Sequence, residues 1–176
     1  MLADGMLDVC FVDPVMDMTC LQIACSYNRL DIVRHLLATK RAELDIDRLD
    51  SKKCTALHST IGRSLSELAL LLLDNGASHQ LCDASGHDAL QVAAIAGCLP
   101  VVEQLVRHRG ADFRRRDQHG NTALHLAVIH QHDDVAVWLI KRGANRKCEN
   151  RAGKTATALA SEKLCMRMES IYDPNA

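Results

Sequence analysis

The chain has 176 residues, of which 48% are hydrophobic and 3% aromatic, and its formal net charge at pH 7 is −1. This apolar content is enough for a packed core and excludes wholesale disorder, while the near-neutral charge gives no whole-chain argument for binding nucleic acid or membranes. The longest apolar runs, such as residues 68–73, are far shorter than the roughly 20 residues needed to cross a bilayer, so we expect no membrane insertion.

The start of the chain and its eight cysteines bear on the cellular compartment. No basic stretch followed by an apolar stretch opens the sequence, so we expect no secretory signal. The cysteines are spaced irregularly and form no C-x-x-C pair, which is typical of reduced thiols rather than of a disulfide framework. We therefore expect a cytoplasmic or nuclear protein.

An internal repeat organises most of the chain. Similar segments begin at Thr19, Thr55, Asp88, Thr122 and Thr155, which stand 36, 33, 34 and 33 residues apart. An apolar stretch follows each of the first four, with the i, i+1, i+4, i+5 spacing of one face of an α-helix. This period predicts one structural unit per repeat. After an N-terminal segment at 1–15, the predicted units are 16–49, 50–82, 83–116, 117–149 and a capping repeat at 150–176.

The best-preserved unit is Asp117-Gln-His-Gly-Asn-Thr-Ala-Leu-His-Leu-Ala, which continues to Lys141-Arg-Gly-Ala-Asn145. It resembles the pattern D-x-x-G-x-T-P-L-H-x-A and the closing G-A-D/N of the ankyrin-repeat family, with alanine in place of the proline. The resemblance covers about residues 16–172 and implies an all-α solenoid, in which helix-turn-helix units are joined by β-hairpin loops. Residues 6–13 resemble the hairpin that closes a repeat, so residues 1–15 are either a capping arm or the remnant of a preceding repeat.

Polar residues at the start of the first helices are expected to link successive repeats. Thr122 can cap its helix through its hydroxyl. The resemblance implies that His58 and His125 bond to backbone in their own or the next repeat and take no part in catalysis. Asp88 and Gln91 replace the usual threonine and histidine of the third unit, so we expect that unit to lack part of this hydrogen-bond network.

Nothing in the sequence favours catalysis. There is no G-x-S-x-G, P-loop or H-E-x-x-H motif. The densest group of metal-ligand residue types is His130–Asp134, but it falls on the turn between two helices, where its two aspartates favour the helix dipole. We therefore expect no enzyme, no cofactor and no metal site. A metal- or small-ligand-binding module, and a regulatory or targeting segment of a larger enzyme, remain as alternatives.

In the family that this chain resembles, partners meet the hairpin tips and the concave face of the first helices. We therefore expect a monomeric protein–protein interaction scaffold or inhibitor. Solvent-facing side chains at the matching positions are predicted to bind the partner protein. These positions are Lys52, Arg63, His87, Ile95, Gln118, His119, Asn121, Ile129 and His130.

Charge is distributed unevenly along the chain. Residues 1–50 carry five Lys/Arg and nine Asp/Glu, a net charge of −4, whereas residues 101–160 carry eleven and six, a net charge of +5. We expect these charges to form one basic patch on two adjacent hairpins, which is either a solvated charged edge or a site that suits an acidic or phosphorylated segment. Neutral net charge and scarce aromatic residues argue against nucleic acid. The patch comprises Phe113, Arg114, Arg115, Arg116, Arg146, Lys147, Arg151 and Lys154.

Two aromatic residues stand apart from this patch. Trp138, the single tryptophan, lies on the second helix of the fourth unit beside core positions. We expect it to pack on the convex side rather than to act as a binding hot spot. Tyr27 falls in the inter-helix turn of the first unit and is expected to join the concave face.

Overall fold

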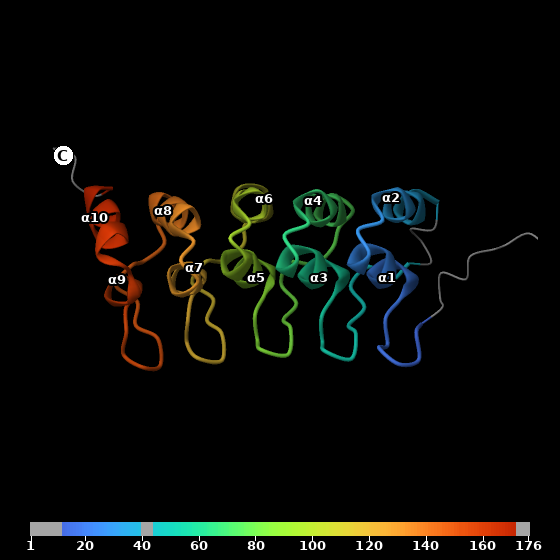
Figure 1. The fold of residues 1–176 in the computed structure, drawn as a ribbon, viewed down its shortest axis with the longest axis horizontal. Coiled ribbons are helices and arrows are strands. Elements are labelled where there is room, and N and C mark those ends of the chain that lie inside the picture. Colours follow the sequence, from blue (N-terminus) through green and yellow to red (C-terminus); the bar gives the residue numbers. More distant parts are fainter. Residues whose placement is uncertain (1–11, 40–43, 172–176) are drawn as a thin grey trace, which may run out of the picture.

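A computed structural model describes residues 12–39 and 44–171, which form ten helices arranged as five pairs (Figure 1). The first helices are α1 (Cys20–Ser26), α3 (Ala56–Gly62), α5 (Ala89–Ala96), α7 (Ala123–Ile129) and α9 (Ala156–Leu159). The second helices are α2 (Leu30–Thr39), α4 (Ser66–Asp74), α6 (Leu99–Arg109), α8 (Asp133–Lys141) and α10 (Glu162–Ser170). Most of the predicted hairpin at residues 6–13 lies outside the described residues. In the described part, none of the helices could span a membrane.

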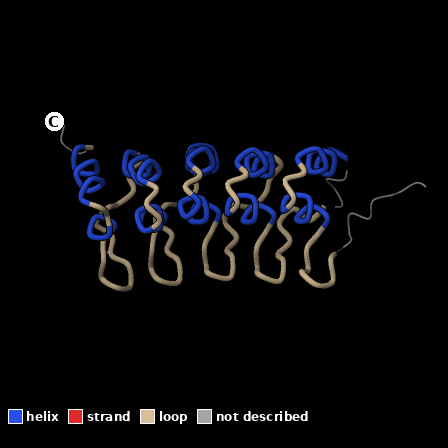
Figure 2. Tube along the Cα trace, in the orientation of Figure 1, coloured by secondary structure: helices blue, strands red, loops and turns tan. Residues whose placement is uncertain are grey.

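The pairs stand side by side in one row of two layers. The second helices form one layer, the first helices form the other, and the connecting loops extend away from the first helices (Figure 1). Each first helix packs on the first helix of the next pair, from α1 on α3 through to α7 on α9. This stacking confirms the predicted all-α solenoid. The loops are mostly turns (Figure 2), because the only β pairing within residues 12–39 and 44–171 is two isolated bridges, Val12–Thr19 and Glu149–Thr155.

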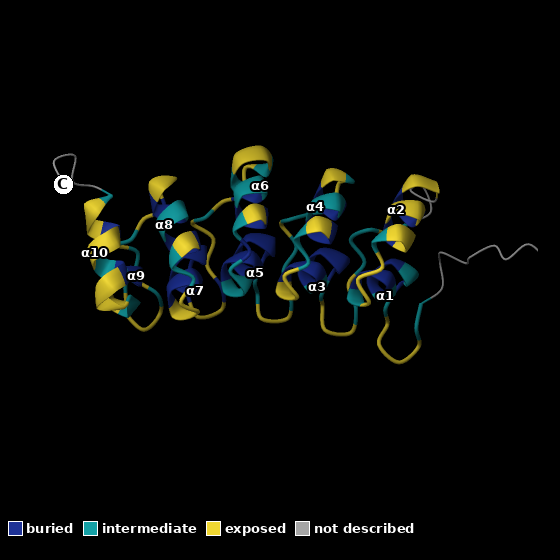
Figure 3. Ribbon diagram, turned by 45° about the horizontal axis from the view of Figure 1, so that its top comes forward, coloured by how far each residue is buried: buried dark blue, intermediate teal, exposed yellow. Residues whose placement is uncertain are grey.

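The core lies between the helix layers and between successive pairs. Leucines from both layers, such as Leu57, Leu72, Leu90 and Leu105, are at most 1% exposed. Helices of four to eleven residues are marginal on their own. Their stability therefore comes from these shared apolar faces, because each buried leucine contributes about 1.5–3 kcal/mol. Figure 3 shows buried faces along both layers and exposed residues at the loop ends.

A capping box starts four of the first helices, at Thr19, Thr55, Asp88 and Thr122. Thr19, Thr55 and Asp88 each accept a hydrogen bond from the backbone N–H three residues on, and the side chain of that third residue returns to the cap's backbone N–H. The box holds the glutamine or histidine side chain against its own helix start. From there the same side chain can also reach the loop of the next repeat.

The glutamine boxes bridge two repeats. Gln22 Nε2 donates to two backbone carbonyls of the next loop, at 2.9 and 3.1 Å. Gln91 Nε2 likewise donates to the carbonyls of Arg115 and Asn121, both at 3.3 Å. The expectation that the third unit lacks part of this network is therefore wrong, because an amide nitrogen carries two N–H donors and serves both carbonyls.

The two histidine boxes differ from each other. His125 Nε2 lies 3.2 Å from the carbonyl oxygen of Lys154 in the next loop, which is the predicted link between repeats. His58 is only 3% exposed, and its Nε2 makes no hydrogen bond. The carbonyls of Leu81 and His87 influence its pKa, but they form no such bond. His58 therefore bonds only within its own repeat, through Nδ1 and Thr55.

Candidate protein-binding surfaces

Each loop between pairs is closed by an aspartate or asparagine that bonds to its own backbone. Asp83 Oδ1, for example, accepts from the N–H groups of Ser85 and His87, both at 2.9 Å. Asp50, Asp117 and Asn150 make the same pair of bonds in the other loops. This closure turns the loop tips outward. The tips and the residues after them expose five of the predicted binding residues: Lys52, Gln118, His119, Arg151 and Lys154.

Two predicted binding residues instead link neighbouring loops. His87 lies between two carboxylates, with Nδ1 3.5 Å from Asp83 and Nε2 3.4 Å from Asp117. Asn121 is 6% exposed, donates to Asp117 at 3.2 Å and accepts from Asn150 at 2.9 Å. The expectation of a solvent-facing side chain is therefore wrong for Asn121. Burial raises the pKa of Asp117, but the bonds from Asn121 and His119 outweigh it and leave this pKa below its ordinary value.

Three arginines of the expected basic patch form bonds or ion pairs with neighbouring repeats. Arg115 lies 3.6 Å from a carboxylate oxygen of Asp88 and donates to the sulfur of Cys82. Arg116 donates to two backbone carbonyls, one in its own loop and one in the next. Arg146 donates to a carbonyl at the end of α10 at 3.0 Å. These guanidinium groups therefore link neighbouring repeats, although Arg115 and Arg116 are exposed to solvent like Arg114 and Lys147, which make no such link with the described residues.

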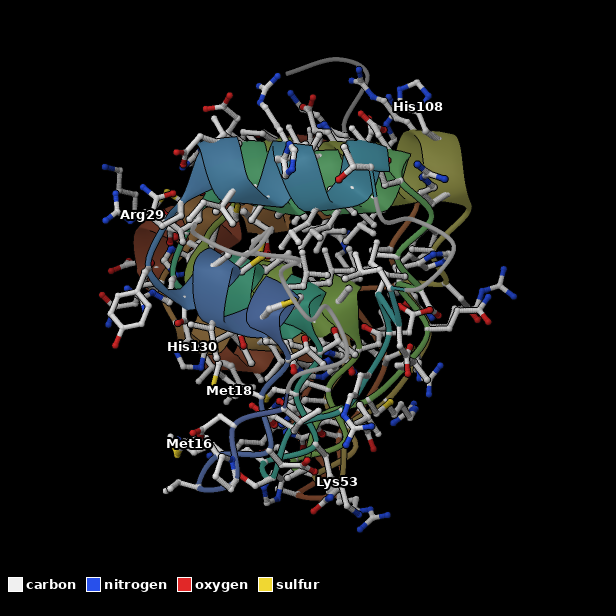
Figure 4. All side chains as sticks on the ribbon, turned by 90° about the vertical axis from the view of Figure 1, so that its right-hand side faces the viewer. Met16, Met18, Arg29, Lys53, His108 and His130 are labelled. Carbon is white, nitrogen blue, oxygen red and sulfur yellow. The ribbon has the colours of Figure 1, made fainter. Side chains whose placement is uncertain are left out.

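A hollow of about 750 Å³ lies between the loops and the first helices of the first three pairs. Met16 and Met18 enter it from the first loop, and Figure 4 shows both on the same side of the molecule as His130. Tyr27, Lys52 and the buried His58, whose Nε2 has no hydrogen-bond partner, line it as well. Met16 is 43% exposed and Tyr27 is 74% exposed, so apolar surface in this hollow is open to solvent.

The remaining predicted positions lie further along the stack. Ile129 is 45% exposed and borders a second hollow of about 630 Å³ at the last pair. His130 is exposed beside it. Ile95 and Phe113 are only half-buried and pack against the core. The exposed apolar surface of the concave side is therefore greatest at its two ends, around Met16 and around Ile129.

The described residues show no arrangement suited to metal-dependent catalysis. Within residues 12–39 and 44–171, no group of three or more His, Cys, Asp or Glu side chains could hold a metal ion. In the His130–Asp134 segment, His132 is turned inward, with Nε2 2.9 Å from the carbonyl oxygen of Ile95. Gly97 makes room for this ring, because a Cβ there would lie 2.4 Å from Nδ1. Burial also raises the pKa of the Cys25 thiol to about 12, which keeps it protonated.

Comparison with known proteins agrees with this architecture. The sequence pattern described as ankyrin repeats (3 copies) matches residues 4–81 and 62–150. The chain belongs to the ankyrin-repeat family. Its ankyrin repeats are similar to those of several curated proteins, and the chain spans less than two thirds of the length of those named below.

Three relatives illustrate the range of proteins that carry similar repeats. The probable 26S proteasome regulatory subunit p28 of Saccharomyces cerevisiae is 30% identical over 139 residues, which cover 78% of this chain and 60% of that protein. Neurogenic locus notch homolog protein 1 of Homo sapiens is 32% identical over 145 residues, 81% of this chain and 5% of that protein. A probable serine/threonine-protein kinase of Dictyostelium discoideum is 37% identical over 82 residues, 44% of this chain and 8% of that protein.

Sequence reasoning missed Met16 and Met18, which line the hollow between the first three loops and first helices, called the groove below. In the four later loops the closing Asp or Asn stands five residues before the helix cap, as Asp50 stands before Thr55. In the first loop Asp13 stands six residues before Thr19. Counted back from the helix cap, however, Met16 and Met18 stand at the positions of His119 and Asn121 in the fourth unit. An alignment on the helix caps would therefore have included both methionines.

Proposed function

We propose that this ankyrin-repeat chain is a non-enzymatic scaffold or inhibitor that binds a partner protein in the hollow between its first three loops and first helices. The observation that carries the proposal is the exposure of Met16 and Tyr27 on the walls of that hollow. Large apolar side chains exposed together at a concave site are typical of protein-binding surfaces. Methionine is suited to this role because its unbranched side chain adapts to different partner surfaces.

The charges around the hollow favour a partner segment that is acidic or phosphorylated. Asp13, Asp50 and Asp83 line the hollow, but each carboxylate accepts hydrogen bonds from its own loop. Lys52 and Arg63 also line it and are exposed, and their side chains form no hydrogen bond or ion pair with the described residues. These aspartates keep their charge but are half-buried, whereas the two cations are exposed and meet a partner first, and an arginine fork matches a carboxylate or a phosphate.

The test is affinity capture from a cell lysate with three forms of the chain. The groove variant carries Met16→Ser and Tyr27→Ser. The matched control is Val15→Ser, because Val15 is 82% exposed in the same loop but does not line the hollow. We expect a protein that wild type and control capture to be lost from the groove variant, with circular dichroism unchanged in all three. Capture of the same proteins by all three forms would refute the proposed site.

The acidic character of the partner is tested separately with Lys52→Gln and Arg63→Gln. Both side chains are exposed, so the substitutions should leave folding intact. Binding of the captured partner should weaken in this double variant. In wild type it should also weaken between low and high salt, because exposed charge pairs are screened. An affinity that neither change alters would leave the apolar groove in place but exclude an acidic segment.

A further inference from the structure

Two arginines from different repeats lie over the indole ring of Trp138 in α8. The guanidinium carbon of Arg142, one turn later on the chain, lies 5.1 Å from the centre of the indole ring. The guanidinium carbon of Arg107, on α6 of the preceding repeat, lies 5.7 Å from the same ring. Trp138 is half-buried against the core, as predicted, but Arg107 and Arg142 are exposed. The ring therefore presents both cations at the surface.

Further cations surround this pair where α6 and α8 end. Glu103, which is 3.9 Å from Arg107, and Asp112, which accepts a bond from the backbone of Arg114, offset part of this charge. The favourable interaction of cations with helix C-termini explains why basic residues gather here. It does not require two of them to share one aromatic ring. Exposed basic residues at the ends of α6 and α8 and in the loops that follow them are Arg107, His108, Arg114, Lys141, Arg142 and Lys147.

This surface is distinct from the groove of the proposed function. Figure 4 shows His108, near the end of α6, on the opposite side of the molecule from Met16 and His130. The helix layers and the loops separate the two sides. A partner bound in the groove would therefore leave the Trp138 surface accessible.

We propose that the Trp138 surface, made of Trp138 and the six basic residues above, is a second docking site, and that it binds a glutamate- or aspartate-rich segment of a partner protein. Stacking on the ring restrains both guanidinium groups in place, which reduces the entropy lost when each forms two bonds to a carboxylate. The two cations also repel each other across one ring, and a bound carboxylate relieves this repulsion.

Two other anionic partners fit this surface less well. Nucleic-acid strands bind to series of stacking rings, whereas this surface has one half-buried ring already covered by arginines. Membrane surfaces are usually held by exposed apolar side chains as well as by charge. The large exposed hydrophobic residues of the described part include none from α6 or α8. A carboxylate-rich protein segment is therefore the partner that this chemistry favours.

Trp138 provides the measurement because it is the single tryptophan of the chain. The probe is a short synthetic glutamate-rich peptide without aromatic residues, titrated while tryptophan fluorescence is recorded. We expect a saturable change that disappears at high salt and when glutamine replaces every glutamate in the peptide. In the variant Arg107→Gln/Arg142→Gln the affinity should fall about tenfold or more, because bonds to charged groups are lost.

Two control proteins separate this site from general charge and from the groove. Arg29→Gln removes an exposed arginine on the other side of the second helices (Figure 4) and should bind the peptide like wild type. Met16→Ser/Tyr27→Ser should also bind it like wild type, so failure of the groove proposal would not affect this result. Arg142→Lys keeps the charge but loses the fork, and we expect an intermediate affinity.

Three outcomes would overturn the proposal. One is the absence of saturable binding to wild type. A second is equal affinity of wild type and the Arg107→Gln/Arg142→Gln variant, with circular dichroism showing that both are folded. The third is tighter binding of a single-stranded oligonucleotide, or of phosphatidylserine vesicles, than of the glutamate-rich peptide, measured with the same fluorescence signal and at the same salt concentration.

Discussion

Two first helices, α3 and α7, begin with the same four residues, Thr-Ala-Leu-His, whose histidine is placed to form a junction with the loop of the next repeat. Only the junction made by α7 has its hydrogen bond to that loop. In both, the histidine Nδ1 lies 2.8–2.9 Å from the threonine hydroxyl of its own cap. His125 then reaches the carbonyl of Lys154 in the next loop. His58 is equally buried, but its Nε2 has no hydrogen-bond partner. An identical motif therefore fixes the bonds within a repeat but not the bond to the next repeat.

The two junctions made by glutamine indicate why the two histidines differ. Gln22 and Gln91 each donate to two carbonyls of the following loop. The neutral imidazole has one N–H, and its rigid ring points it in one direction, so a small displacement of the loop loses the bond. The amide has two N–H groups on a flexible side chain and tolerates such displacement. Coupling between repeats therefore depends on side-chain reach as well as on the family pattern.

The largest expected effect comes from truncating the two histidines. His125→Ala should lower the free energy of unfolding by about 3 kcal/mol, because it empties buried space and removes the bond to Lys154. His58→Ala empties similar space but removes no bond between repeats and eliminates an unsatisfied buried nitrogen. It should therefore cost about 1 kcal/mol less. Urea unfolding followed by circular dichroism measures both values, and equal losses would contradict the difference between the junctions.

Adding the missing hydrogen bond at the His58 junction is expected to stabilise the chain, by less than the histidine truncations destabilise it. In His58→Gln the amide should reach the carbonyls near the ring, as Gln91 does one repeat later, and raise the free energy of unfolding by about 1 kcal/mol. His125→Gln is the matched control and should be nearly neutral, because it exchanges one satisfied junction for another. A His58→Gln variant no more stable than wild type would show that the loop after α4 holds its carbonyls too far away.

The helices and their stacking could be predicted from the sequence because they depend on the period of the apolar residues. Leu57, Leu90 and Leu124 recur at nearly constant spacing, and the burial of each follows from its place on a helix. Such positions tolerate small shifts of the backbone. The repeat period, together with the resemblance to ankyrin repeats, was therefore enough to predict the stacked helix pairs.

The surfaces were harder to predict because hydrogen bonds depend on shifts smaller than an ångström. Arg114 and Arg115 are neighbours in a basic run, but only Arg115 lies against Asp88 and Cys82 of the preceding repeat. The sequence gives no sign of which arginine is engaged. Likewise, Trp138 was correctly placed beside the core, but the stacking of Arg107 depends on how two repeats are offset.

The smallest expected effect is a difference in pH dependence between wild type and His58→Gln. Burial lowers the pKa of His58 and of His125 below the ordinary value of 6.5. As the pH falls below about 6.5, the unfolded chain therefore binds protons at these rings that the folded chain resists, and the free energy of unfolding decreases. His58→Gln has one such ring fewer, so its decrease between about pH 7.5 and 5.5 should be smaller, by less than about 1 kcal/mol.

This comparison is made by urea unfolding of both proteins across that pH range. Burial raises the pKa of Asp88, so acid favours the folded state at that carboxyl and opposes the effect of the histidines. Asp88 is present in both proteins, and the difference between their curves largely removes its contribution. Parallel curves would mean that His58 takes up its proton as readily in the folded chain as in the unfolded one. The incomplete junction would then be open to water, and the predicted gain from His58→Gln would have to be small as well.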